Sequence, residues 1–419
     1  MDSPVRRNPL RHFAHSDLRG AAQMAVLATE GVTTMVEGVH NVVLDRLDAS
    51  KMKPPAATRH VTRFVYQAIR QVTRLVGKGT EAGLLQLEPL LAPSDPDQAG
   101  TPERRAALAA LNGVLGDRLL AHDSPLAVPM SFSIRDQGLD GQVMPPESAV
   151  SGKVLLLIHG LCMDDLGQSQ DSGSSHGETL ASTLGYSPVS LRYNSGLHIS
   201  TNGRELAVRL EKLLENWAVP VEELSIVAHS MGGLVARSAD HYARQQGLRW
   251  PERLKNMIFL GTPHHGAPLE KGGNWMDVLL DSTPYTRPFS ALGRVRSAGI
   301  TDLRHGNLLD EDWSGRDRFK RSPDLRQGVP LPEGVACYTV AGALSAKTRR
   351  LVNRLAGDGL VPVKSALGQH SDSQKALPFP ASSQWVAYEV SHLGLLNSAR
   401  VTRQLLNWLG TEATVPTVS

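Results

Sequence analysis

The chain has 419 residues, of which 41% are hydrophobic and 20% are charged. That length is enough for one large globular domain or two modest ones. The 44 Lys and Arg residues are nearly balanced by 41 Asp and Glu, so no basic surface is available for a phosphate backbone. We therefore expect no nucleic-acid partner.

Features of secreted and membrane-spanning proteins are not found in the sequence. The two cysteines, Cys162 and Cys337, allow at most one disulfide, so the fold does not depend on a disulfide framework. The longest aliphatic run, residues 154–158, is far shorter than the roughly 20 residues of a membrane-spanning helix. Residues 1–19 lack the apolar stretch of a secretory signal. We expect a cytoplasmic protein, with membrane association as an alternative and no indication of oligomeric state.

Apolar residues recur at helical spacing through the N-terminal part of the chain, which predicts a helical region over residues 1–125. The pattern indicates helices at residues 17–47, about 61–76 and 102–122. Mixed charges and broad apolar faces favour a helical layer that packs on the rest of the chain. The alternative is peripheral contact with a membrane through a basic helical surface.

Residues 126–419 alternate between strand and helix patterns, which predicts a second domain of α/β class. We expect a mostly parallel sheet with crossover helices on both faces. A half-buried strand at 130–134 is followed by a predicted turn at Asp140 and Gly141. Further strands are expected at 153–158, 188–193, 223–228, 254–260, 336–341 and 384–390, and helices at about 202–217, 232–246 and 395–409.

The segment from Leu224 to Gly233 indicates a nucleophilic serine. An apolar strand enters the sequence Ala228-His-Ser-Met-Gly232 and continues directly into an amphipathic helix. This is the pattern of a nucleophile elbow, in which a strained turn projects the Ser230 hydroxyl above the sheet. The small residues on either side fit because the turn is crowded. The alternative is a tight turn with an incidental serine.

A serine nucleophile needs a base, and the base needs a carboxylate to orient it. His392 directly follows the last expected strand, and Asp358 lies between two glycines in the connection after the preceding strand. In this type of site the chain order is serine, acid, histidine, so we predict Asp358 and His392 as the partners of Ser230. The less favoured histidines are His241, His264, His265, His305 and His370, and the less favoured acids are Asp302, Asp310, Asp312, Asp317, Asp324 and Asp372.

Acyl transfer also requires donors for the oxyanion of the tetrahedral intermediate. We predict the main-chain amides of Met231, which follows the nucleophile, and Leu161, which follows the strand ending at His159-Gly160. His159 is expected to brace this turn, and Cys162 has no base placed to activate it. No metal is expected, because the adjacent His264 and His265 do not match the spacing of metal ligands.

The connection at about 268–332 is long for a compact domain. We interpret it as a cap over Ser230 that shapes an acyl pocket, with a peripheral insertion as the alternative.

These motifs together resemble the α/β-hydrolase superfamily over about residues 128–409. They are His159-Gly-Leu161, the Ala228 to Gly232 elbow, Phe259-Leu-Gly-Thr-Pro-His-His-Gly-Ala-Pro268, Gly357-Asp-Gly-Leu-Val-Pro362 and Ser391-His-Leu-Gly394. Within the superfamily they are similar to the bacterial lipase and esterase branch related to GPI inositol-deacylase-like proteins. The resemblance implies cofactor-free hydrolysis of small-molecule or lipid carboxylic esters through an acyl-serine, with Ser230, Asp358 and His392 as the triad. An acyltransferase or amidase with the same triad, and a non-catalytic scaffold that binds a membrane or partner, are the alternatives.

Overall fold

The computed structural model describes residues 102–134, 137–139, 145–164, 175–267, 296–320, 323–346 and 357–410. The helices expected at residues 17–47 and about 61–76 lie outside these ranges. The chain divides into two compact units, Met1–Arg105 with Ala121–Leu126, and Ala106–Leu120 with Ala127–Ser419. The second unit contains the sheet.

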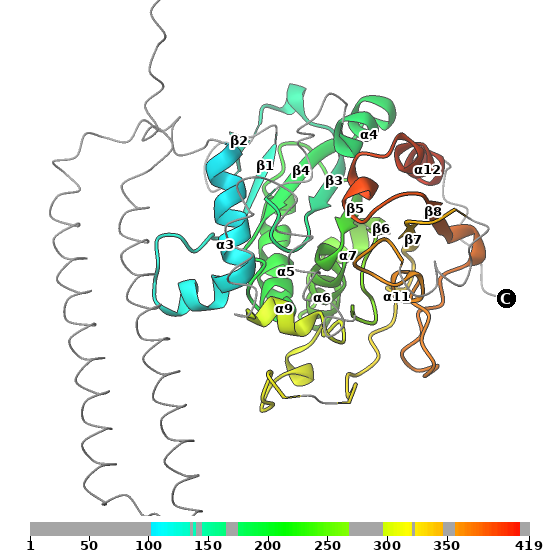
Figure 1. Cartoon of the computed structure of the whole chain (residues 1–419). Helices are drawn as coiled ribbons and strands as arrows, with labels where there is room; N and C mark the ends of the chain where they lie inside the picture. Colours follow the sequence, from blue (N-terminus) through cyan, green and yellow to red (C-terminus); the bar gives the residue numbers. More distant parts are fainter. Residues whose placement is uncertain are drawn as a thin grey trace, which may run out of the picture. The chain divides into compact units, whose positions relative to one another are not determined.

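Among the described residues, eight strands form one sheet in the order β2-β1-β4-β3-β5-β6-β7-β8 (Figure 1). The strands are β1 (Ser131–Ile134), β2 (Gln137–Gly138), β3 (Lys153–Ile158), β4 (Ser187–Arg192), β5 (Glu223–His229), β6 (Leu254–Leu260), β7 (Ala336–Ala343) and β8 (Gln384–Tyr388). The adjacent strands in the series β4-β3-β5-β6-β7-β8 pair in parallel, whereas β1 pairs antiparallel with β2 and β4. The expected fold class, an α/β-hydrolase fold with a mostly parallel sheet, is confirmed.

Helices cover both faces of the sheet. The α-helices are α3 (Pro102–Ala121), α4 (His176–Leu184), α5 (Ile199–Glu215), α6 (Met231–Gln245), α7 (Trp250–Arg253), α9 (Ala298–Asp302), α11 (Val363–Ala366) and α12 (Ala399–Gly410). Short 3₁₀ helices are η2 (Glu147–Ala149), η4 (Asp310–Asp312), η5 (Ala381–Ser383) and η6 (Leu393–Leu396). Helices α5 and α6 pack together against one face, and α4 and α12 pack together on the other.

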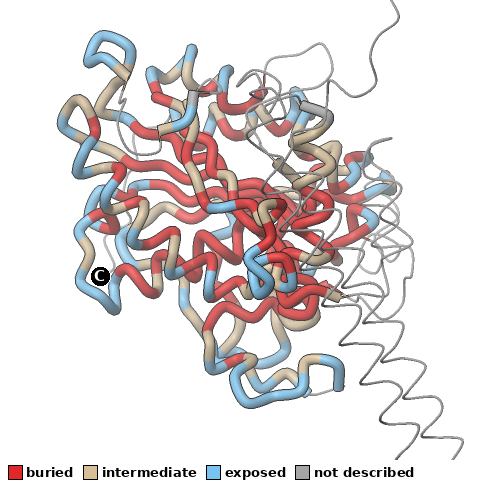
Figure 2. Tube along the Cα trace, turned by 90° about the vertical axis from the view of Figure 1, so that its left-hand side faces the viewer, coloured by how far each residue is buried: buried red, intermediate tan, exposed pale blue. Residues whose placement is uncertain are grey.

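The central strand β3 shows why these strands are apolar on both faces. Val154, Leu156 and Ile158 belong to the core beside α5 and α6, whereas Leu155 and Leu157 belong to the core beside α4 and α12. All five side chains are buried, and Figure 2 shows the buried chain concentrated in the sheet and its flanking helices. Burying each such side chain contributes about 1.5–3 kcal/mol to stability.

Several boundaries differ from those expected. Ile134 of β1 pairs with Gln137 of β2, which differs from the pairing that a turn at residues 140–141 would give. Asp140 and Gly141, the expected turn, lie outside the described residues. Helix α4 was not expected, and α12 begins at Ala399 because the preceding residues form η6 and not an α-helical turn.

The part of α3 in the second unit packs on the sheet domain. A Cβ atom on Gly113 would lie 2.2 Å from the Cys162 sulfur, so the helix approaches the loop after β3 closely. Asn112 Oδ1 accepts from the Val128 amide at 2.9 Å, and Asp117 accepts from Arg318 at 2.6 Å. Residues 106–120 of this helix therefore contact the rest of the unit that contains the sheet. No helix in the described ranges combines the length and apolarity needed to span a bilayer.

Candidate active site

Ser230 occupies a strained turn between β5 and α6. Its backbone angles are φ 53° and ψ −126°, outside the regions that L-residues favour. A conformation of this kind costs about 1–3 kcal/mol and persists where neighbouring contacts hold it. One such contact is the hydrogen bond from the Ser230 amide to the Leu260 carbonyl, at 2.8 Å.

Small residues around the turn are required by close backbone contacts. A Cβ atom on Gly232 would lie 2.5 Å from the His159 carbonyl oxygen, which belongs to the main chain and cannot move freely. A Cβ atom on Gly160 would lie 2.9 Å from the Ser230 Cβ. Ala228 is fully buried. The loop after β3 is therefore pressed against the nucleophile turn.

Asp358 and His392 form a buried pair. His392 Nδ1 lies 2.7 Å from Asp358 Oδ2, and the His392 amide donates to the Asp358 carbonyl at 3.0 Å. The second carboxylate oxygen accepts from the Leu360 and Val361 amides at 3.0 and 2.8 Å. The exposed fractions are 2% for Asp358 and 3% for His392. The carboxylate is thus fixed, and in the neutral ring it places the proton on Nδ1 and the lone pair on Nε2.

The pair lies beside the nucleophile turn at the carboxyl edge of the sheet. The ring of His229, the residue before Ser230, lies 4.6 Å from the ring of His392. A Cβ atom on Gly261 would lie 3.1 Å from His392 Nδ1 and 3.2 Å from Asp358 Oδ2, so Gly261 packs directly against the pair. No hydrogen bond joins Ser230 to His392 within the described structure. Such bonds often form only when substrate is bound.

The two amides expected to bind an oxyanion lie at turns next to Ser230. Met231 is the first residue of α6, where a helix N–H has no intrahelical acceptor. Neither the Met231 amide nor the Leu161 amide donates to another described residue. The next amide, that of Cys162, is occupied by Ser195 Oγ at 3.1 Å. Burial raises the pKa of the Cys162 thiol to about 12, which disfavours the thiolate that a reactive cysteine needs.

His159 braces the loop after β3, as expected. Its Nδ1 donates to the Gly160 carbonyl at 2.8 Å, and its ring stacks on Tyr193 with 4.3 Å between centroids. Tyr193 in turn donates to the His159 carbonyl at 2.9 Å.

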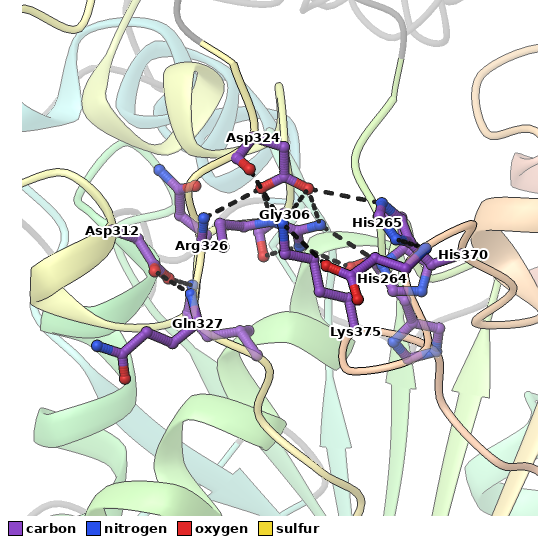
Figure 3. Close-up of polar contacts among 12 residues, drawn as sticks. His264, His265, Gly306, Asp312, Asp324, Arg326, Gln327, His370 and Lys375 are labelled. Carbon is purple, nitrogen blue, oxygen red and sulfur yellow. Dashed lines mark hydrogen bonds and ion pairs between the residues drawn. The ribbon is translucent and has the colours of Figure 1, made fainter.

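Three of the less favoured histidines, His264, His265 and His370, belong to a polar network around Arg326 and Asp324 (Figure 3). Arg326 donates to the carbonyls of His264 and Gly306, both at 3.0 Å, and its Nε donates to Asp324 at 2.9 Å. His264 also lies 3.4 Å from an Arg237 nitrogen. Cationic neighbours disfavour a metal ion here, and no group of three potential metal ligands occurs in the described ranges.

Competing aspartates are engaged elsewhere. Asp302 accepts from His198 Nδ1 at 3.0 Å and from the Ile199 amide at 2.9 Å. Asp312 accepts from the amides of Leu308 and Leu309. Of the aspartates considered as the acid, Asp358 alone contacts His392 among the described residues.

We expect buried histidines to make the fold less stable in acid. Burial, together with the charge of Arg326, lowers the pKa of His265 from 6.5 to about 4. Below pH 6.5 the unfolded chain therefore binds a proton that the folded chain does not, so stability falls as the pH falls from 6.5 towards 4. Burial also lowers the pKa of His264 and His229, with the same sign.

We expect the midpoint of thermal unfolding to fall by roughly 5 °C or more between pH 7 and pH 5. Calorimetry at both pH values tests this, with His265→Gln as the comparison. The variant should lose less stability than the wild type over this interval. An equal loss in both proteins would show that His265 does not contribute.

The insertion is described from residue 296 onward. The Gly299 amide donates to the Gly196 carbonyl at 3.0 Å, and the Ala267 amide donates to the Leu303 carbonyl at 2.9 Å. These bonds connect α9 to the loops after β4 and β6. Ser238 on α6 then donates to the Leu308 carbonyl at 2.7 Å. Residues 268–295 lie outside the described ranges, so a cap over Ser230 stays a prediction.

Two residues that contact the Asp358 and His392 pair were not predicted from the sequence. His229 contacts His392, and Gly261, with φ 59°, packs against the Asp358 and His392 pair. A histidine at the end of an otherwise apolar strand and a glycine directly after β6 were the available signals.

Residues 129–303 match a family model described as a domain of unknown function, DUF7379. No curated protein matches the chain. Among solved structures, the mature lipase BlEst2 of Bacillus licheniformis is similar at 16% identity over 64% of this chain and 96% of that one, with a TM-score of 0.37. The phospholipase PlaB of Legionella pneumophila is similar at 15% identity over 62% of this chain and 61% of that one, with a TM-score of 0.37. The Pyrococcus furiosus esterase Pf2001 is similar at 12% identity over 67% of this chain and 87% of that one, with a TM-score of 0.35.

Proposed function

We propose that this chain is a serine hydrolase that cleaves carboxylic esters through an acyl-serine intermediate. The observation that carries the proposal is the Ser230 turn, with φ 53°, beside the buried Asp358 and His392 pair joined at 2.7 Å. A strained serine between a strand and a helix, next to a histidine oriented by a carboxylate, is the arrangement that activates a hydroxyl for acyl transfer. The resemblance to the lipase and esterase branch related to GPI inositol-deacylase-like proteins agrees with it.

In the proposed reaction His392 Nε2 takes the proton of Ser230 as Oγ attacks the ester carbonyl. The amides of Leu161 and Met231 stabilise the resulting oxyanion. Protonated His392, stabilised by Asp358, then gives its proton to the departing alkoxide. The alcohol departs, and an acyl-serine remains. Water, deprotonated by His392, attacks the acyl group, and the acid is released as His392 returns this proton to Ser230 Oγ. No cofactor is needed for these steps.

We propose a small-molecule or lipid ester as substrate, with the insertion shaping the acyl pocket. A cytoplasmic protein that contacts membranes peripherally would reach lipid esters without a spanning helix.

Hydrolysis of p-nitrophenyl esters from acetate to palmitate tests the proposal, with Ser230→Ala as the blank and detergent titrated through its micellar threshold. We expect a serine-dependent rate on at least one ester. A rate that rises with chain length and with micelles would identify a lipase, and a short-chain optimum would identify an esterase. If no ester gives a serine-dependent rate, the proposed ester hydrolysis is wrong, and amides and acyl acceptors become the substrates to test.

A further inference from the structure

His229 makes contacts that neither the nucleophile turn nor the triad explains. It is the last residue of β5 and is completely buried. Its Nε2 lies 3.1 Å from the main-chain oxygen of His392, and the two rings are inclined by 47°. Burying a polar ring costs free energy unless it is hydrogen bonded, so this bond compensates for the burial of His229.

The carbonyl oxygen determines which nitrogen of His229 carries the proton. Burial, with the neighbouring His392, holds the pKa of His229 well below its ordinary value, so the ring is neutral at pH 7. A carbonyl only accepts hydrogen bonds, so the single proton is on Nε2. Nδ1 is then an acceptor, and it has no hydrogen-bond partner among the described residues. His229 is therefore a neutral donor to the loop that carries the base.

The bond to His229 adds a third point at which the His392 residue is held. Asp358 accepts from the ring of His392 and also from its amide. The carbonyl of His392 accepts a hydrogen bond from His229 at the end of β5. Since His229 precedes Ser230, the strand that carries the nucleophile also fixes the peptide of the base.

We propose that His229 is a positioning residue, whose Nε2–H bond to the His392 carbonyl sets the distance between the base and the Ser230 hydroxyl. This inference rests on the function proposed above. A misplacement of about 1 Å in an active site can cost about 100-fold in rate, so loss of the bond should lower kcat. We expect binding of the ester to be little affected, because the His229 side chain is completely buried and its Nε2 is bonded to the peptide of His392.

Two amide side chains of different length test this. In His229→Gln the amide nitrogen can occupy the place of Nε2 and still donate to the carbonyl, whereas His229→Asn is too short to reach it. We expect the Asn variant to lose about 10- to 100-fold in kcat with KM within about threefold of the wild type, and the Gln variant to regain most of this loss.

His176→Asn is the matched control. His176 is also buried and its Nε2 lies 2.8 Å from the Leu395 carbonyl, three residues beyond the base. We expect this variant to unfold at lower temperature but to keep kcat within about threefold. That result would separate positioning of His392 from general support of its loop.

Three results would overturn the inference. One is wild-type kcat in a folded His229→Asn protein, and another is an equal loss in the Asn and Gln variants. The third applies even if the variants do not fold: nitrogen NMR of the histidine-labelled wild-type chain should show His229 protonated at Nε2 alone, and a proton on Nδ1 would contradict the bond. A wild-type protein without Ser230-dependent turnover would instead show that the proposed function has failed, since the His229 comparison requires an active enzyme.

Discussion

Replacing Ser230 with alanine should remove serine-dependent ester hydrolysis, with kcat falling by at least about 10⁴-fold. The thiol of Cys162, on the adjacent loop, is not expected to replace the serine, because burial raises its pKa and keeps it protonated. The midpoint of thermal unfolding should stay within about 2 °C, because the alanine methyl retains the Cβ that packs against Gly160. Ester hydrolysis and calorimetry on the same preparation measure both effects.

Ser230→Gly is the matched variant for the backbone strain. Glycine adopts φ 53° and ψ −126° without a Cβ penalty, so this variant should be as inactive as Ser230→Ala but more stable. Glycine also has more conformational entropy in the unfolded chain, which offsets part of this gain. We therefore expect Ser230→Gly to be about 1 kcal/mol more stable than Ser230→Ala, with an unfolding midpoint roughly 2–4 °C higher.

The two variants separate the chemical and structural parts of the interpretation. Retained turnover in Ser230→Ala would show that the nucleophile lies elsewhere. Collapse of the fold in that variant would show that Ser230 has a structural role. A glycine variant less stable than the alanine variant would contradict the strain attributed to the turn.

The central strands could be predicted because burial on both faces gives them a recognisable sequence pattern. A parallel strand covered by helices on both faces must be apolar at every position, as residues 154–158 are, and the expected bounds of 254–260 match β6. Helix α4 was missed because it follows residues with no periodic pattern. Its one local signal was the capping box of Ser175 and Glu178, which the structure forms.

The position of the candidate site residues could be predicted from chain order and strand ends. Residues that follow parallel strands meet at one edge of the sheet, so Ser230 and His392 could be placed there without knowledge of their separation. The contact between Asp358 and His392 at 2.7 Å follows from that edge and from the glycines beside the acid.

Contacts between distant segments could not be predicted. The bond from His229 to the His392 carbonyl joins residues 163 positions apart and involves the main chain, which no pattern of side chains reveals. The packing of the insertion depends on Arg326 and its bonds to two carbonyls, again main-chain atoms. The conformation of such segments is determined by tertiary contacts and not by local periodicity.

Asp358→Asn should lower kcat by about 10³- to 10⁴-fold while leaving KM nearly unchanged. The reason is that the two carboxylate oxygens have different hydrogen-bond partners. Oδ1 accepts from the amides of Leu360 and Val361, so an asparagine would keep its oxygen there and turn its NH₂ group towards His392. The ring would then have to accept at Nδ1 and carry its proton on Nε2. A ring in that tautomer cannot take the proton of Ser230.

Asp302→Asn provides the control, because it changes another buried aspartate that contacts a histidine. Asp302 is 1% exposed and lies 3.0 Å from His198 Nδ1, in the insertion and not against His392. If loss of a buried carboxylate were enough to disable the enzyme, both variants would lose kcat alike. We expect Asp302→Asn to unfold at lower temperature and to keep kcat within about threefold. Full turnover in Asp358→Asn would refute its role as the orienting acid, whereas a large loss confined to that variant, with KM preserved, would mean that the tautomer of His392 controls the rate.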